Sequence, residues 1–333
     1  MVSWWRRVKA RVAGWFSRAP VPGRFEHGRR FAWRGFVATA PLVWPARDYL
    51  VYVPRGRPRW RRVPLLVLCH GCKQTAESFA QSTRIAELAD REGFVVLLPQ
   101  QKDTANPWRC WNWFERRTAE GHGEAAIVAA QIRAVRRAYR IDRRRVVAAG
   151  LSAGGALAAI LGMRHPDLVR AVAVHSGLAC GAATSPVTAL RVMAQGPDAD
   201  VVAIGAAARR THAARDLRIP LLAIHGADDD VVRPRNAAAL VRQYLAVNGV
   251  TVAPAGAGDD LPPADHEETL ALPDGRRQIV REWRCDGRLA VRYVEVQGLG
   301  HAWVGGDPAH RFTTAGPPDA AALAAGLFAD AAS

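Results

Sequence analysis

Short runs of apolar residues recur along this chain and separate segments with helical periodicity. Most of these runs lack the alternation of a half-buried strand, and such runs are typical of strands in a parallel sheet covered on both faces. The strands that we expect are Asp48–Pro54, Val63–Cys69, Phe94–Leu98, Val146–Ala149, Ala171–Val174, Pro220–Ile224, Gln278–Trp283 and Ala290–Val296.

Helical spacing of apolar residues fills the segments between these strands. The helices that we expect are Glu77–Glu92, Gly123–Tyr139, one from Ser152 to about Met163, Pro234–Asn248 and one from about Asp319. Strands that alternate with helices predict a doubly wound, mostly parallel α/β sheet with right-handed crossovers. The Pro-, Gly- and Asp-rich segment Thr251–Gly275 is predicted to be a surface insertion.

The organisation of the chain changes at about residue 45. Residues 1–45 are rich in Arg, Pro and Gly, and the alternation of strands and helices begins only after them. We therefore expect an N-terminal extension over residues 1–45 and one α/β domain over residues 46–333, a length that single α/β domains commonly reach. No stretch approaches the roughly 18–20 apolar residues that a membrane-spanning helix needs.

The chain carries a net charge of +16, nearly all of it from arginine. This charge predicts attraction to polyanions, although a solvated arginine-rich surface is the simpler explanation. No nucleic-acid-binding motif is present, so no specific nucleic-acid partner is expected. Within Met1–Arg18, Trp and other apolar residues recur at helical spacing between arginines. This pattern suits a helix at an acidic membrane surface, and a helix docked on its own domain or a frayed tail fits it as well.

The sequence Gly150-Leu151-Ser152-Ala153-Gly154 carries the strongest chemical signal. It lies where a predicted buried strand ends and a helix begins. G-x-S-x-G at such a junction is the nucleophile elbow of the α/β-hydrolase fold, in which a strained turn lifts the serine Oγ above the sheet. The alternative is a glycine-rich turn with a capping serine. We predict that Ser152 is a nucleophile.

A serine nucleophile needs a histidine base held by a carboxylate, and in this fold the order is Ser, Asp or Glu, then His. Three aspartates at 228–230 follow the predicted strand Pro220–Ile224, and the spacing alone leaves the choice among them open. His301 follows the last predicted strand through Gly298-Leu299-Gly300 and is the predicted base. His225 is expected to position the aspartate loop.

The oxyanion of the intermediate needs two N–H donors. The amide of Ala153 is the first candidate because it follows the nucleophile. We assign the second to Cys72, in the loop His70-Gly71-Cys72 after an early strand. The alternative interpretation of that loop is a simple turn.

Several motifs occur together in the order of one known family. They are HGCKQ at His70–Gln74, CWNWF at Cys110–Phe114, GLSAGG at Gly150–Gly155, HSGL at His175–Leu178 and GHAWVGG at Gly300–Gly306. From about residue 45 to the C-terminus the chain resembles the polyhydroxybutyrate (PHB) depolymerase family of esterases, whose relatives include feruloyl and acetylxylan esterases. Residues 1–45 match nothing in that family, and Val304 stands where the family often has serine.

The resemblance implies an α/β-hydrolase fold and the hydrolysis of carboxylic esters through an acyl-enzyme, without cofactor or metal. It places the catalytic acid at Asp229, the fourth residue after the histidine of H-G-x-x-D. It also implies a disulfide between Cys72 and Cys110. Poly(3-hydroxybutyrate) or its oligomers are the first expected substrate, with feruloyl or acetylxylan esters as the alternative.

Trp111, Trp113 and Trp303 are predicted to line the substrate pocket, with core packing as the alternative. A peptidase of the oligopeptidase type would use the same triad, but the chain has no room for a propeller cap. An interpretation of another class is a module that binds polymer granules or acidic membranes through the N-terminal basic segment, with little hydrolysis. The family resemblance implies export, whereas charges interrupt every apolar run before Pro20, so extracellular, cytoplasmic and granule-associated locations all stay open.

Overall fold

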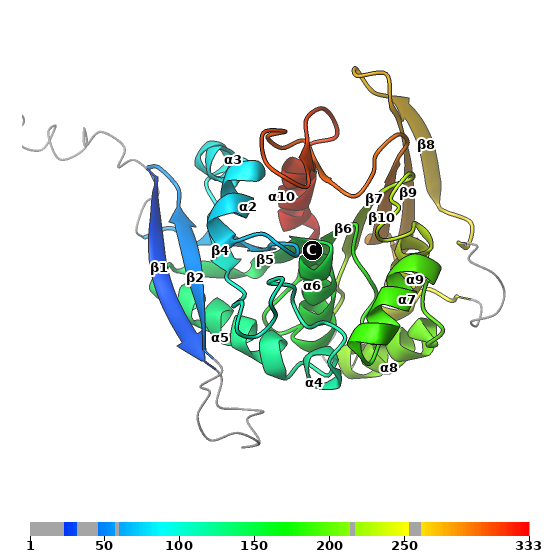
Figure 1. Cartoon of the computed structure of the whole chain (residues 1–333), viewed down its shortest axis with the longest axis horizontal. Helices are drawn as coiled ribbons and strands as arrows, with labels where there is room; N and C mark the ends of the chain where they lie inside the picture. Colours follow the sequence, from blue (N-terminus) through cyan, green and yellow to red (C-terminus); the bar gives the residue numbers. More distant parts are fainter. Residues whose placement is uncertain (1–22, 32–45, 57–59, 214–216, 253–260, 333) are drawn as a thin grey trace, which may run out of the picture.

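The computed structural model describes residues 23–31, 46–56, 60–213, 217–252 and 261–332. Within these residues one ten-stranded sheet has the order β1-β2-β4-β3-β5-β6-β7-β10-β9-β8, and β11 and β12 form a separate pair. Six neighbouring strands of the large sheet, from β4 through β10, run parallel, and the strands on either side of them pair antiparallel. This is the mostly parallel α/β sheet that the apolar runs predict (Figure 1).

The strands are β1 (Arg24–Phe31), β2 (Ala46–Val53), β3 (Val63–Cys69), β4 (Val95–Pro99), β5 (Ile141–Leu151), β6 (Ala171–His175), β7 (Leu221–Gly226), β8 (His266–Ala271), β9 (Arg277–Cys285), β10 (Arg288–Val296), β11 (Trp303–Val304) and β12 (Thr313–Thr314). The helices are α2 (Ala76–Ser82), α3 (Ile85–Glu92), α4 (Arg116–Ala119), α5 (Gly123–Ala138), α6 (Ala153–Arg164), α7 (Pro186–Gln195), α8 (Val201–Ala213), α9 (Arg235–Val247) and α10 (Ala320–Asp330).

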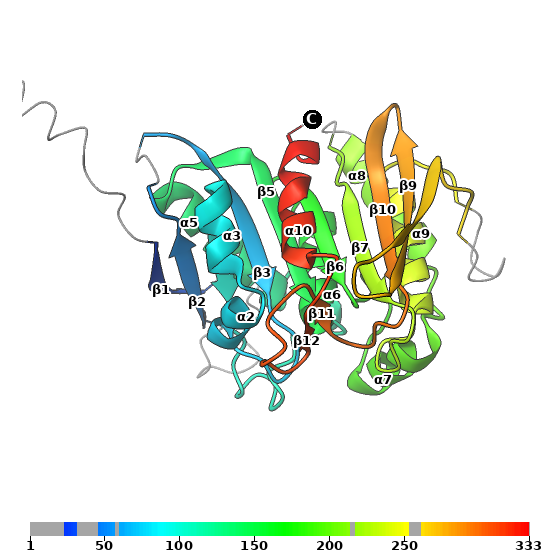
Figure 2. The same ribbon diagram turned by 90° about the horizontal axis from the view of Figure 1, so that it is seen from above.

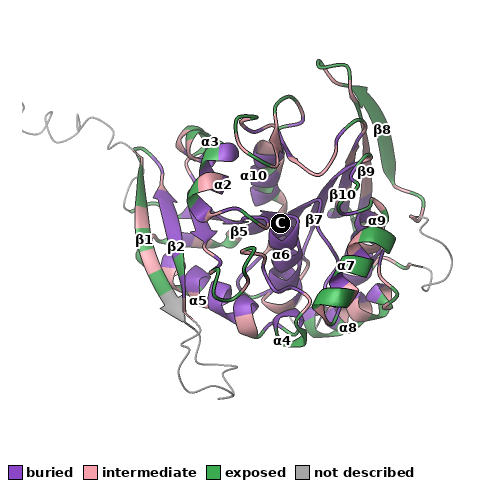
Figure 3. Ribbon diagram, in the orientation of Figure 1, coloured by how far each residue is buried: buried purple, intermediate pink, exposed green. Residues whose placement is uncertain are grey.

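Helices cover both faces of the sheet, and the side chains of β3 show why its sequence is apolar throughout. Leu65 and Val67 belong to the core beneath α5, α6 and α9, whereas Leu66 and Leu68 belong to the core beneath α2, α3 and α10. Successive side chains of a strand point to opposite faces, so a strand covered on both sides must be apolar at every position. Figure 3 shows this buried centre between two helical layers.

The sheet begins earlier than the sequence analysis proposed. β1 lies within the segment assigned to an extension, yet it pairs with β2 along its whole length, from Arg24 opposite Val53 to Phe31 opposite Ala46. An edge strand needs no continuous apolar run, and charged residues there protect it from pairing with other chains. For this reason the pattern did not reveal it. The predicted helix pattern of Met1–Arg18 lies outside the described residues.

Two other local predictions were incomplete. The single helix expected over Glu77–Glu92 is divided into α2 and α3, because the Thr83 hydroxyl bonds back to the Phe79 carbonyl at 2.7 Å and Arg84 takes a left-handed φ of 51°. The segment Thr251–Gly275 contains β8, whose residues are all exposed, so its described part lies at the surface as predicted but extends the sheet. No helix in the described ranges is both long and apolar enough to span a membrane.

Candidate active site

Ser152 occupies the sharp turn between β5 and α6. Its backbone has φ 55° and ψ −120°, a conformation that costs a serine about 1–3 kcal/mol and persists only where the surroundings impose it. The Ser152 N–H donates to the carbonyl of His175 at the end of β6, with an N···O distance of 2.9 Å. The side chain stands at the N-terminus of α6, where the helix dipole favours negative charge.

The glycines around Ser152 are required by space. A Cβ on Gly150 would lie 2.4 Å from the carbonyl carbon of Gly154, and a Cβ on Gly154 would lie 2.2 Å from the carbonyl oxygen of Cys69. The first turn of α6 therefore packs directly on the ends of β5 and β3. This close approach brings Ser152 to the same edge of the sheet as the loop that contains Cys72.

Asp229 follows β7 and is fully buried, whereas Asp228 and Asp230 are exposed. The Nδ1 atom of His301 lies 2.8 Å from Oδ2 of Asp229. The backbone N–H groups of Val231 and Val232 donate to the other carboxylate oxygen at 3.0 and 2.8 Å. Of the three adjacent aspartates, Asp229 is thus the one that contacts the histidine.

The hydrogen bonds of Asp229 define its charge and the tautomer of His301. Burial raises the pKa of Asp229, but the hydrogen bond to His301 and the charges of the neighbouring histidines together lower it by more. The pKa therefore lies below its ordinary value. A carboxylate at that position accepts the Nδ1 proton of His301 and leaves Nε2 as the acceptor of the neutral imidazole. The pair can therefore orient a base and stabilise an imidazolium.

Backbone contacts bring the aspartate and histidine loops together. The N–H of Asp228 donates to the Leu299 carbonyl at 3.1 Å. A Cβ on Gly226 would lie 2.0 Å from that same carbonyl oxygen, so the approach needs glycine. Buried His225 supports the aspartate loop, since its Nε2 lies 2.7 Å from the Val232 carbonyl and 3.5 Å from Asp229 Oδ2.

His175 is the residue whose role the sequence analysis missed. Its carbonyl accepts from Ser152, and its Nε2 accepts from the N–H of Val304 at 3.3 Å, three residues beyond His301. The ring stacks on Trp303 with centroids 5.3 Å apart. Burial and the nearby charges of His225 and His301 lower the pKa of His175 to about 3, which keeps the ring neutral. His175 therefore links the nucleophile turn to the histidine loop. Its sequence signals were its position at a strand end and its place in the motif HSGL, and neither indicated this link.

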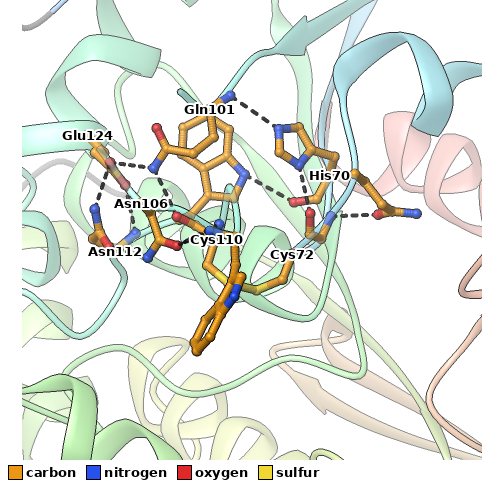
Figure 4. Close-up of a disulfide and its surroundings, with 11 residues drawn as sticks. His70, Cys72, Gln101, Asn106, Cys110, Asn112 and Glu124 are labelled. Atoms are coloured by element: carbon orange, nitrogen blue, oxygen red, sulfur yellow. Dashed lines mark hydrogen bonds between the residues drawn. A yellow bond between two sulfur atoms is a disulfide. The ribbon is translucent and has the colours of Figure 1, made fainter. Parts of the chain in front are cut away.

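The two oxyanion candidates lie on the elements that the sequence suggested. Ala153 is the first residue of α6, and Cys72 is in the loop after β3. Cys72 forms a disulfide with Cys110, the pairing that the family resemblance implied (Figure 4). The disulfide joins the loop after β3 to the Trp-rich loop, and a second link runs from the Lys73 N–H to the Trp108 carbonyl at 2.7 Å.

A buried polar network supports the Trp-rich loop behind the disulfide. The Gln101 side chain donates to the Cys110 carbonyl at 3.0 Å and to Glu124 at 2.5 Å. Glu124 also accepts from the Asn112 N–H at 2.8 Å (Figure 4). It pairs with Arg47 at 3.1 Å. A buried carboxylate satisfied in this way costs far less than an unpaired one and holds the loop in one conformation.

The prediction that three tryptophans line the substrate pocket needs correction. Trp111, Trp113 and Trp303 are exposed by at most 4% and belong to the two core clusters. Trp111 donates from Nε1 to the His70 carbonyl at 3.0 Å, and Trp303 packs edge-on against Phe79. Their burial and contacts make them core residues that support the site loops. Burial of a large aromatic ring also stabilises the fold more than exposure does.

Comparisons with known proteins identify the family of this chain. Residues 47–260 match the family described as Esterase PHB depolymerase, a range that includes Ser152 and Asp229 and ends before His301. The chain is 33% identical over 205 residues to poly(3-hydroxyalkanoate) depolymerase C of Paucimonas lemoignei, covering 61% of this chain and 49% of that protein. It is 30% identical over 193 residues to feruloyl esterase B of Thermothelomyces thermophilus, covering 56% and 66%.

A solved structure shows the same fold. Acetyl xylan esterase from Aspergillus awamori superposes with a TM-score of 0.63 at 19% identity, covering 84% of this chain and 94% of that one. The chain spans about half the length of the poly(3-hydroxyalkanoate) depolymerase and just under two thirds of the feruloyl esterase.

Proposed function

Because the chain belongs to the PHB depolymerase family of esterases, we propose that it is a serine carboxylic-ester hydrolase that acts through an acyl-enzyme. Ser152 is the nucleophile, His301 the general base and Asp229 the carboxylate that orients the base. The α/β domain continues to the C-terminus, because β10, the His301 loop and α10 follow the residues that match the family.

The reaction proceeds in two steps. His301 Nε2 takes the proton of Ser152 while Oγ attacks the ester carbonyl, and the amides of Ala153 and Cys72 stabilise the oxyanion. Collapse of the intermediate releases the alcohol, which receives the proton from His301. Water, activated by the same histidine, then attacks the acyl-enzyme and releases the acid.

One observation supports this proposal most strongly. A buried aspartate holds a histidine at 2.8 Å, at the same sheet edge as a serine in a strained turn at a helix N-terminus. A strained non-glycine residue is costly and is typical of a functional site. A glycine-rich turn with a capping serine requires neither the strain nor the buried pair.

The substrate is proposed from the relatives. Hydroxyalkanoate polyesters or their oligomers come first, because a poly(3-hydroxyalkanoate) depolymerase is 33% identical to this chain. Esters of plant polysaccharide are the alternative, since relatives also include feruloyl esterase B and probable acetylxylan esterase A.

The test is hydrolysis of p-nitrophenyl acetate and butyrate by the wild type and by Ser152→Ala. Three natural ester classes are assayed alongside: 3-hydroxybutyrate oligomers, methyl ferulate and acetylated xylan. Ser185→Ala is a matched control, because Ser185 only caps α7. We expect Ser152→Ala to lose at least about a thousandfold in kcat and the control to retain activity. A folded wild type that is inactive on every ester would contradict the proposal, and the ranking of the natural esters selects the substrate.

A further inference from the structure

We propose that the edge of the sheet opposite Ser152 is a docking surface for the phosphate groups of anionic phospholipids. This surface, called the arginine edge below, consists of two arginine-lined cavities at the starts of β5, β6, β7 and β10 and the exposed residues Trp60–Arg62 before β3. The inference does not rest on the proposed activity, since none of its residues belongs to the candidate active site.

The first cavity has a volume of about 400 Å³ and lies where α5 ends and β5 begins. Its lining residues are Arg133, Arg136, Arg137, Arg143, Asp167 and Leu168. The Arg136 guanidinium donates to the backbone carbonyl of Asp167 at 3.3 Å rather than to its carboxylate. Burial, and then the charges of Arg143 and Arg133, lower the pKa of Arg136 by more than the charge of Asp167 raises it. The positive charges here therefore repel one another, and an anion between them would lower the free energy.

The second cavity has a volume of about 260 Å³ and contains four more arginines. They are Arg144, Arg170, Arg218 and Arg288, and the acidic residue of the lining is Asp330. Eight arginines and two aspartates thus line the two cavities. Arg218 also pairs with Asp286 outside the lining, which leaves a large positive excess.

Topology places both cavities at one edge. Arg143 and Arg144 are consecutive residues at the start of β5, and each lines one cavity. Arg170 and Arg218 come just before β6 and β7, and Arg288 is the first residue of β10. These strands are parallel, so their N-terminal ends share the edge opposite the loops that hold Ser152, Asp229 and His301 (Figure 2).

The positive surface continues toward β3 and includes an exposed aromatic ring. Val63 pairs with Ile141, which brings Arg61 and Arg62 beside the start of β5. Both arginines are exposed, and Trp60 before them is 77% exposed. A tryptophan among arginines is typical of the boundary between apolar lipid and water.

The first described strand, β1, begins at the same edge. Arg24, the first residue of β1, pairs with Val53 at the end of β2, and β2 runs antiparallel to β4. β1 therefore begins at the side of the sheet where the arginines gather. Met1–Arg18 combines Trp and Phe at helical spacing with five basic residues in its sequence. A basic surface and a basic segment that contains Trp are two lipid-binding signals that strengthen each other when one chain carries both.

The geometry of the guanidinium group favours phosphate as the anion. A guanidinium presents a planar fork of N–H groups that bonds two phosphate oxygens at once, and eight of them can bind several headgroups. Docking in this way points the candidate active site away from the lipid. β3 crosses the sheet in seven residues beside an irregular β5, so the two edges lie roughly 20 Å apart and the bound protein would act on esters in solution rather than on the surface that holds it.

The test is co-sedimentation of the full chain with vesicles of phosphatidylcholine alone or mixed with phosphatidylglycerol. The variant replaces the exposed arginines 133, 137, 143 and 144 with glutamine, and the control replaces the exposed arginines 84, 116, 191 and 277. Both variants lose the same charge. We expect the first to bind mixed vesicles at least about tenfold more weakly than the wild type, and the control to bind within about threefold.

Three outcomes would overturn the proposal. Equal weakening in both variants would show a general charge effect, and equal binding of the wild type to both vesicle types would exclude the phosphate headgroup. Tighter binding to duplex DNA than to mixed vesicles, lost in the first variant, would assign the arginine edge to nucleic acid. Far-UV circular dichroism and p-nitrophenyl butyrate hydrolysis establish that the first variant is folded.

Discussion

Charged side chains are arranged differently at the two ends of the same parallel strands. At the C-terminal ends, Asp229 and His175 are buried, and their side chains accept hydrogen bonds from His301, Val232 and Val304. At the N-terminal ends, arginines from several segments line open cavities with few carboxylates among them. One edge thus buries paired polar groups, and the other presents many arginines around open cavities.

Helix direction helps to explain why each edge tolerates its charges. The N-terminus of α6 lies at Ser152 and favours the oxyanion. The C-terminus of α5 lies at the arginine edge, with Arg136 and Arg137 in its last turn, and the C-terminus of α10 borders the second cavity. Partial negative charge at these helix ends stabilises nearby arginines by about 0.3–1 kcal/mol each. One α/β scaffold thus presents a positive helix end at the edge with Ser152 and negative helix ends at the arginine edge.

The largest expected effect is the difference in kcat/KM between substitutions of Asp229 and Asp330, two aspartates at opposite edges of the sheet. Asp229→Asn should lower kcat/KM for p-nitrophenyl butyrate by about 10²- to 10⁴-fold, because an amide no longer holds His301 in the required tautomer. Asp330→Asn, at the arginine edge, should stay within about threefold of the wild type. Equal losses in the two variants would mean that the carboxylate at 229 has no special role.

A smaller effect tests His175 as a positioning residue. His175→Phe retains a ring to stack on Trp303 but removes the acceptor for the Val304 N–H. We expect kcat to fall by about tenfold while KM stays within about threefold, because such a change misplaces His301 relative to Ser152. His165→Phe, at the far end of α6, is the control. A rise in KM alone, or an equal loss in the control, would rule out positioning.

The same residue predicts how stability changes with pH. The pKa of His175 is lowered to about 3 in the folded protein, so between pH 6.5 and 3 the unfolded chain binds the proton first. Its stabilising contribution is complete above pH 6.5 and is lost as pH falls toward 3. From pH 7.5 to 4.5, urea denaturation of His175→Phe should show about 2–3 kcal/mol less acid destabilisation than the wild type. Identical losses would show that His175 titrates normally.

The smallest expected effect is at the arginine edge. Replacing arginines 133, 137, 143 and 144 with glutamine should change kcat/KM for p-nitrophenyl butyrate by less than about twofold, because these charges lie beyond the screening length from Ser152. The assay is repeated at low and physiological salt. A large change at low salt that disappears with added salt would mean that the two edges are electrostatically coupled.

Much of the fold could be predicted from residue patterns. The run Val63–Cys69 coincides with β3, and the helix after Ser152 coincides closely with α6, because strand and helix signals within a covered sheet are local and strong. β1 escaped prediction because a polar edge strand has no apolar run. The break at Arg84 depends on one hydroxyl and one left-handed residue inside an otherwise helical pattern.

Some features of the candidate site could likewise be predicted from the sequence, and others could not. The sequence by itself determined the turn at Ser152, since Gly150 and Gly154 meet their tight contacts within a few residues of the serine or at the adjoining strand. It also located His301 by chain order. Spacing could not choose among the aspartates at 228–230, because burial and a partner 72 residues away make that choice.

Only the tertiary structure decided the contacts made between distant segments. These are the pairing of Asp229 with His301, the link from Ser152 through His175 to Val304, and the gathering of arginines from α5 and the starts of β5, β6, β7 and β10. The physical reason is that apolar periodicity reports local conformation and burial, whereas the meeting of polar side chains depends on strand order and helix packing across the whole sheet.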